Sequence, residues 1–285
     1  MDWQLLAGLA TGCAASLCMN VGKGVQKMKV RVLAQGRAAF AGKNRRDLAV
    51  WTFGVLMTAS ATVLFSKALQ MTDKPSIVSS LNGVGLIGLA LFSHFILKER
   101  VGRREVAAVG LIIAGTALVQ FFNVKPEGGQ AYSFQWLLRC AGGAAAVFAV
   151  LIIPAVKTGR GFAFTFGALA GTLIGFALML GDIALIESGG DFLGQLRNPY
   201  PYVAVPTGAL AMAVTQVAFF RGSAVFVVPT INSFIIIVPM VMEVFIFGAA
   251  LVFLQYAGAA AIVAGIVTLT TPGKQPDVSP RGGVC

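Results

Sequence analysis

Nine apolar runs, each of about twenty residues, follow one another along the chain with short polar segments between them. A helix of about 20 apolar residues crosses the hydrocarbon core of a bilayer. Charged residues make up 12% of the chain, about half the share in an average soluble domain, and they gather between the runs. We therefore expect an all-α polytopic membrane protein without a sizeable soluble domain. The expected spans are residues 3–22, 48–69, 76–97, 105–123, 134–153, 161–180, 201–220, 224–247 and 251–270.

One stretch of the chain occurs twice. Residues 76–82 open an apolar run in the first copy, and residues 226–232 open a similar run in the second. Asn232 follows Asn82 by 150 residues, and Gly265 follows Gly115 by the same 150 residues. A duplication in a very apolar chain is typical of transporters built from internal repeats. Chance similarity between two apolar helices is the alternative interpretation.

The basic residues indicate how the chain is oriented in the membrane. The net charge is +11, and most Lys and Arg residues fall in segments that the nine spans place on the same side. Because Lys and Arg favour cytoplasmic loops, we expect the N-terminus outside and the C-terminus in the cytoplasm of a multi-pass inner- or plasma-membrane protein. The two copies then cross the bilayer in opposite directions. Membrane orientation explains the charge, so we expect no nucleic-acid partner.

The expected organisation is therefore two inverted repeats of unequal size. The first repeat, residues 1–123, has four spans, and the second, residues 134–270, has five. Residues 23–46 contain eight Lys and Arg residues and no acidic residue. We interpret this segment as a cytoplasmic loop, in part a surface helix, standing where a further span would make the halves equal. An outer linker (124–133) joins the repeats, and a disordered cytoplasmic tail (271–285) follows them.

Several short motifs resemble those of a known transporter superfamily. They are Ala68-Leu69 followed by Ser76-Ile77-Val78, Leu97-Lys98-Glu99-Arg100, Gly110 with Gly115, Val227-Val228-Pro229 and Gly265. On these residues the chain resembles EamA-type members of the drug/metabolite transporter superfamily, whose domains are inverted repeats of α-helices. It is most similar there to the NIPA-type magnesium transporters, which share nine helices, an outside N-terminus and a Gln-Lys pair, here Gln26-Lys27. The resemblance implies a secondary transporter of a small solute or cation and, in its narrower form, a magnesium permease.

At one point the chain departs from the pattern of that superfamily. The second copy there often ends a helix with Gly-Glu, whereas this chain has Gly248-Ala249. Glu99 therefore has no counterpart in the second copy. We expect Glu99 to pair with neighbouring arginines at the membrane edge.

Glu243 is the one acidic residue well inside an expected span. An ionisable group there is costly and is a candidate for function. Pro239, one turn earlier, frees the carbonyl of Ile235, so that a cation or proton site could form beside the carboxylate. The alternative is that Glu243 reaches water at the outer surface. Lys67 lies at a similar depth, and we expect either a Lys67–Glu243 pair or a Lys67 side chain that extends to the interface.

Three neutral polar residues are further candidates for a solute pathway. Asn82 and Asn232 are the repeat-related pair, and in an inverted repeat they would face a common central cavity from opposite sides. Gln216 lies in the seventh expected span and could line the same path. The alternative for all three is interhelical hydrogen bonding, which contributes about 0.6 kcal/mol on average in membranes.

Gly167, Gly171 and Gly175 form a row of small residues at every fourth position, which predicts close helix packing. The partner helix could belong to the same chain or to a second subunit, so a homodimer is possible. The lipid bilayer and a small solute or cation, with Mg²⁺ as one possibility, are the other expected partners.

Signatures of an enzyme are missing from the sequence. The chain has no phosphate-binding GxxxxGK[ST] loop, no HExxH sequence and no convincing nucleophile–base set, so we expect neither catalysis nor a cofactor. No set of metal ligands is defined. A membrane scaffold without transport activity is the alternative function from another class. The sequence leaves the solute, the direction of transport and the coupling ion open.

Overall fold

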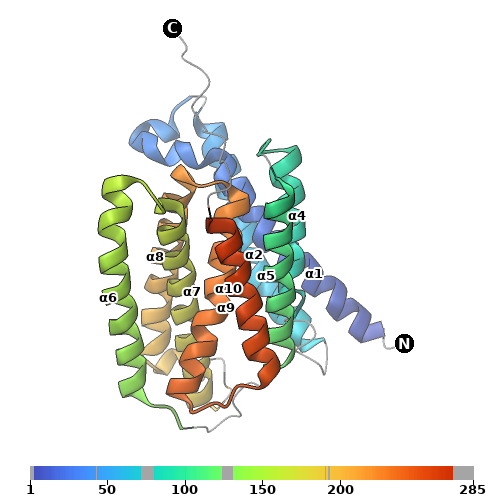
Figure 1. Cartoon of the computed structure of the whole chain (residues 1–285), viewed down its shortest axis with the longest axis vertical. Helices are drawn as coiled ribbons and strands as arrows, with labels where there is room; N and C mark the ends of the chain where they lie inside the picture. Colours follow the sequence, from blue (N-terminus) through green and yellow to red (C-terminus); the bar gives the residue numbers. More distant parts are fainter. Residues whose placement is uncertain are drawn as a thin grey trace.

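Helices make up the regular secondary structure of this computed structural model, which describes residues 3–42, 44–71, 80–99, 101–123, 131–189, 191 and 193–271 (Figure 1). The α-helices are α1 (Trp3–Lys29), α2 (Asn44–Gln70), α4 (Val84–Phe95), α5 (Arg103–Phe121), α6 (Phe134–Thr158), α7 (Phe162–Glu187), α8 (Tyr200–Arg221), α9 (Ala224–Ile246) and α10 (Phe253–Thr270). Three 3-10 helices accompany them: η1 (Val30–Phe40), η2 (Leu81–Gly83) and η3 (Gly194–Arg197).

The predicted all-α polytopic membrane fold is confirmed. Within the part of the chain that the structure describes, eight helices are long and apolar enough to cross a membrane, and the shorter apolar segment Leu81–Phe95 lies within the third expected span. Large apolar side chains such as Leu56 and Val63 on α2 and Val147 and Val150 on α6 are exposed. These faces suit contact with lipid tails, since the side chains are apolar and a helix satisfies its own backbone hydrogen bonds.

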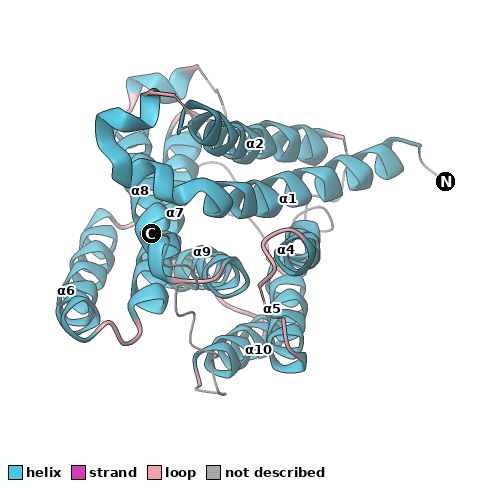
Figure 2. Cartoon of the chain, turned by 90° about the horizontal axis from the view of Figure 1, so that it is seen from above, coloured by secondary structure: helices cyan, strands magenta, loops and turns pink. Residues whose placement is uncertain are grey.

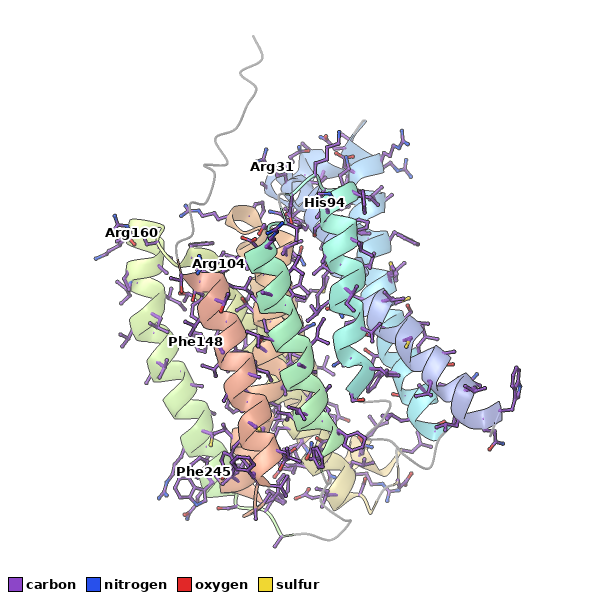
Figure 3. The ribbon with its side chains drawn as sticks, turned by 45° about the vertical axis from the view of Figure 1, so that its right-hand side comes forward. Arg31, His94, Arg104, Phe148, Arg160 and Phe245 are labelled. Carbon is purple, nitrogen blue, oxygen red and sulfur yellow. The ribbon has the colours of Figure 1, made fainter. Side chains whose placement is uncertain are left out.

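Basic residues gather at one end of the helix bundle. Figure 3 shows Arg31, Arg104 and Arg160 at this end, which we call the basic end, together with His94 in the last turn of α4. Phe245, in the last turn of α9, lies at the opposite end, which we call the far end. The repeat-related helices α4 and α9 therefore run in opposite directions, as an inverted repeat requires.

Helix pairing follows the same scheme in the two halves of the chain. In the first half α1 packs against α2 and α4, and in the second half α7 packs against α8 and α9. The remaining helices of the scheme, α5 and α10, pack against each other. Helix α6 contacts α7 and α9 at the edge of the bundle and has no counterpart among the described residues (Figure 2). In this scheme α1 is equivalent to α7, so the position equivalent to α6 falls ahead of α1 and not at residues 23–46, where the sequence suggested it.

The contact between α5 and α10 is reciprocal. A Cβ atom on Gly115 would lie 2.5 Å from the carbonyl oxygen of Gly258 and 2.7 Å from Ile262. A Cβ atom on Gly265 would lie 2.8 Å from the carbonyl oxygen of Ala108 and 2.6 Å from Ile112. Each member of one contact is 150 residues from its equivalent in the other. A pseudo-twofold axis between α5 and α10 accounts for this exchange, in agreement with the duplication read from the sequence.

Helix α1 is longer than the sequence indicated. Residues 23–29, which we assigned to a cytoplasmic loop, continue α1, and Gly22 to Gln26 are buried. Three neighbouring helices account for this burial: Gly22 and Gln26 contact α2, Gly24 contacts α4, and Lys23 bonds to Asn232 of α9. Residues 30–40 form η1, in which Val30, Val32 and Ala39 are buried, and residues 44–46 already belong to α2.

Helix α9 is the most deeply buried of the spans and lies in the middle of the bundle (Figure 2). The glycine row of α7 faces it. A Cβ atom would lie 2.5 Å from the carbonyl oxygen of Ile231 at Gly171 and 3.0 Å from Pro239 at Gly175. At Gly167 it would be in ordinary contact with Thr230. The partner of the row is therefore within the chain, and the row itself offers nothing to a second subunit.

Some expectations fall on residues that the structure does not describe. The tail 271–285 lies outside the described residues apart from Thr271, as does the linker 124–133 apart from residues 131–133. The motif at residues 76–78 and Arg100 are also outside them.

Candidate functional site: a buried polar cluster between α1 and α9

Three polar side chains meet where α1 crosses α9, and we call Asn20, Lys23 and Asn232 the central polar cluster. Their exposed fractions are 0%, 5% and 6%. Lys23 Nζ donates to Asn232 Oδ1 at 3.2 Å, and Asn232 Nδ2 donates to Asn20 Oδ1 at 2.7 Å. Asn20 Nδ2 in turn donates to the carbonyl oxygen of Ser16 at 2.9 Å. Asn232 starts roughly 12 Å into α9 at 1.5 Å per residue, so the cluster lies within the membrane-spanning part of the bundle.

The lysine determines the direction of these hydrogen bonds. An ammonium group can donate but cannot accept, so the amide oxygen of Asn232 must face it. The amide nitrogen of Asn232 then faces Asn20, whose own nitrogen points to the Ser16 carbonyl. Four groups from two halves of the chain are thereby held in one orientation.

A second set of bonds brings Asn82 to the cluster. Ser16 Oγ donates to the carbonyl oxygen of Asn82 at 2.7 Å and accepts from the N–H of Gly85 at 2.8 Å. Gly85 is required for this approach, because a Cβ atom there would lie 2.0 Å from the Ser16 carbonyl oxygen. The hydroxyl of Ser16 thus positions the start of α4 against α1.

Asn82 and Asn232 line one small space, together with Gly83, Leu86, Thr116 and Ile236, which is closed in this structure and has no room for a water molecule. The structure therefore brings together the two repeat-related asparagines that the sequence singled out. Thr116 is 2% exposed, and its Oγ1 is buried with no hydrogen-bond partner among the described residues. A buried hydroxyl without a partner costs about 1–3 kcal/mol, so this one is available to a bound polar group.

Gln216 belongs to a neighbouring set of bonds, nearer the basic end. Its Nε2 donates to Gln26 Oε1 at 2.7 Å, and its Oε1 accepts from Trp51 Nε1 at 3.1 Å. Gln26 Nε2 donates to Thr58 Oγ1 at 2.9 Å and to the Gly54 carbonyl at 3.2 Å. The amide groups of Gln216 and Gln26 are thus already satisfied on both atoms. These bonds tie α8 to α1 and α2.

At the basic end, two contacts join the two halves of the chain. Lys27 Nζ donates to the carbonyl oxygen of Phe219 near the end of α8. Both carboxylate oxygens of Glu99 accept from the N–H of Ala224, at 2.9 and 3.0 Å, and Oε2 also accepts from Val225 at 3.3 Å. Glu99 therefore caps the N-terminus of α9, and it forms no ion pair with the described arginines Arg103 and Arg104; Arg100 lies outside the described residues. The reason for the capping is that a helix N-terminus presents free N–H groups and a partial positive charge to an anion.

The remaining candidates, Glu243 and Lys67, lie toward the far end. Glu243 is half-buried in the last turns of α9, and its carbonyl oxygen accepts from the N–H groups of Phe247 and Ala249. Lys67 is exposed near the end of α2. The Lys67–Glu243 pair stays a prediction.

A tyrosine–carboxylate contact closes the loops at the far end. Tyr132 donates from its hydroxyl to Glu187 Oε1, at the end of α7, and lies 2.5 Å from the Tyr200 hydroxyl at the start of α8. Partial burial, reinforced by the bonds to Glu187 and Tyr200, raises the pKa of Tyr132 above its ordinary value. The neutral phenol is therefore the form that belongs to this contact.

Lys23, Asn20 and Thr116 were not among the residues that sequence reasoning selected. A signal for the first two was present: Asn20, Lys23 and Gln26 follow one another at intervals of three, which places them on one face if the helix continues past residue 22. The segment was assigned to a loop because of its positive charge, so this periodicity was not considered.

The described residues contain no group of three or more His, Cys, Asp and Glu side chains able to hold a metal ion. The polar atoms near the small space are amides, hydroxyls and one ammonium group. Such a set suits a solute with hydrogen-bonding groups better than a bare cation.

Comparison with known proteins gives one match. No curated protein and no solved structure matches the chain. The model of the EamA-like transporter family matches residues 4–121, which run from the first turn of α1 to the last residue of α5. The part of the chain that supplies Asn20, Lys23, Asn82 and Thr116 is therefore similar to EamA-like transporters.

Proposed function

We propose that this protein is a secondary transporter of the drug/metabolite type, which moves a small solute across the membrane by alternating access. The observation that carries the proposal is the small space at the middle of the bundle, lined by Asn82 from the first half and Asn232 from the second. These residues are 150 positions apart on helices of opposite direction. Solute sites of inverted-repeat transporters lie at such an interface between repeats.

Two contacts at the basic end support alternating access. Lys27–Phe219 and Glu99–Ala224 join the two halves at the basic end. We infer that the basic end is cytoplasmic, by the positive-inside rule. These two contacts must then separate for a solute to pass between the central space and the cytoplasm.

A magnesium permease, the narrower form of this function, finds no support in the site. The ammonium group of Lys23 lies next to Asn232 and would repel a divalent cation in the same space. Mg²⁺ also prefers one or two carboxylates with retained water. The half-buried Glu243 is separate from this cluster, at the far end of α9.

Cysteine accessibility tests the proposal without knowledge of the solute. Thr116→Cys would be introduced into a variant in which Cys13, Cys18, Cys140 and Cys285 are replaced. Alternating access predicts that a membrane-impermeant maleimide labels this cysteine in both right-side-out and inside-out vesicles. The matched control is Thr172→Cys on α7, which is 4% exposed and does not line the space, and which is expected to resist labelling from either side.

A non-transporting scaffold predicts a different result. Its packed interior would protect Thr116→Cys in both vesicle orientations. Labelling from one side alone would also contradict alternating access, since the space would then never open to the other side.

A further inference from the structure

We infer that the solute carries a single carboxylate group, which binds between Lys23 and the amide and hydroxyl groups around Asn232 and Thr116. This inference rests on the proposed function and specifies its substrate class. Lys23 is a basic residue inside a membrane-spanning helix, and it is only 5% exposed. Its hydrogen bond within the described residues goes to a neutral amide oxygen, Asn232 Oδ1.

The ammonium group of Lys23 has no counter-charge among the described residues. Removing a charge from water costs several kcal/mol, which a neutral amide offsets in part and an anion offsets much better. The one salt bridge among the described residues joins Lys29 and Asp47, which are partly exposed on α1 and α2. Two of the three N–H donors of Lys23 are thus free for a ligand.

The space beside the cluster supplies the remaining recognition groups. Asn232 forms part of its wall and is in direct contact with Lys23. Thr116 also lines the space, and its Oγ1 is buried and has no partner among the described residues. These are two independent observations, an ammonium without an anion and a hydroxyl without a partner among the described residues. Asn232 connects them, because it lines the space with Thr116 and bonds to Lys23. An anionic group that accepts hydrogen bonds from both satisfies each of them.

The number of charges selects the class of anion. Lys23 is the one cation of the cluster, since the next basic residue, Lys27, is engaged with the Phe219 carbonyl at the basic end. One positive charge matches one carboxylate. A phosphate dianion or a dicarboxylate would leave a second negative charge among neutral amides and apolar side chains, where it would be strongly disfavoured.

Matched acid–amide pairs test this assignment. The thermal unfolding midpoint of the purified protein would be measured with propionate, lactate and benzoate, each compared with its primary amide, and with succinate. We expect at least one monocarboxylate to raise the midpoint in a saturable manner, and its amide and succinate to leave it unchanged. Lys23→Met is expected to weaken the binding of that acid about 10- to 100-fold, the effect of removing a hydrogen bond to a charged group.

Three further variants keep the test interpretable. Lys29→Met removes a partly exposed lysine of the same helix, outside the cluster, and is expected to keep the full response to the acid. Thr116→Val preserves the side-chain shape and is expected to weaken binding several-fold even if Lys23→Met fails to fold. Lys23→Arg retains the charge and is expected to bind the acid better than Lys23→Met.

Three results would overturn the inference: equal responses to an acid and its amide, an unchanged response in Lys23→Met, or no response to any of the monocarboxylates. Failure of the proposed function is distinguishable from these results. In that case Thr116→Cys would be protected from both sides of the membrane, whereas a wrong substrate class leaves its two-sided labelling intact.

Discussion

Gly171 lies where α7 packs on α9, and replacing it with alanine is expected to destabilise the protein. The added Cβ atom would lie 2.5 Å from the carbonyl oxygen of Ile231 and 2.7 Å from Cβ of Phe234. Both obstacles are rigid, because one is backbone and the other is the first atom of a side chain. Overpacking of this kind costs about 1–3 kcal/mol, and we expect the upper part of that range.

Alanine also favours the helix, which offsets part of this cost. Gly is about 1 kcal/mol worse than Ala in a helix interior. The net destabilisation for Gly171→Ala is therefore about 2 kcal/mol. At about 2–4 °C per kcal/mol, the thermal unfolding midpoint should fall by about 4–8 °C.

The same helix provides the matched control. A Cβ atom on Gly181 would meet nothing within 4 Å. Gly181→Ala should therefore show the helix-propensity gain alone, a rise of the midpoint by about 2–4 °C. Both variants would be measured in detergent from intrinsic tryptophan fluorescence. Equal effects of the two substitutions, or loss of an oligomer in Gly171→Ala without a change in the midpoint, would refute the assignment of the glycine row to α9.

Three smaller predictions follow from contacts outside the central cluster. Glu99→Gln removes the charge that caps α9 and should lower the free energy of unfolding by about 1 kcal/mol. It should also speed maleimide labelling of Thr116→Cys from the cytoplasmic side. An unchanged labelling rate would argue against opening at the basic end. Neutral Tyr132 stabilises the fold fully below the ordinary tyrosine pKa of about 10, and this contribution is lost as the pH rises toward its raised pKa. Alkaline unfolding curves should therefore depend less on pH in Tyr132→Phe, and identical curves would contradict this. Lys29→Met removes a partly exposed ion pair and should change stability by less than about 1 kcal/mol, as denaturant titration would show.

Much of the fold could be predicted because the bilayer imposes a simple length and polarity rule on each span. The runs of about twenty apolar residues correspond to the helices of the structure, and the 150-residue offset leads to the exchange of contacts between α5 and α10. The assignment of basic segments to cytoplasmic loops was wrong for residues 23–29, which continue α1. A basic residue normally marks a loop, but here α1 continues through Lys23, which is buried and bonds to Asn232 of α9.

The candidate site was predicted in part. Asn82 and Asn232 were selected by their equivalent positions, and they line the same space. Lys23 and Thr116 depend on how α1 and α5 are rotated about their axes, which apolar periodicity does not define in helices with apolar residues on most faces. The role of Glu99 could not be foreseen either, because its partners, the N–H groups of Ala224 and Val225, are 125 and 126 residues away in the sequence.

The most direct test of the central claim is uptake of the stabilising monocarboxylate into proteoliposomes by wild type, Asn232→Leu and Lys29→Met. Asn232 lines the small space and bonds to Lys23, whereas Lys29, the control residue, lies outside the central polar cluster. We predict saturable uptake by wild type and by Lys29→Met, and loss of uptake in Asn232→Leu with its thermal unfolding transition retained. Uptake by folded Asn232→Leu at the wild-type rate would contradict the claim that solute passes through the centre of the bundle.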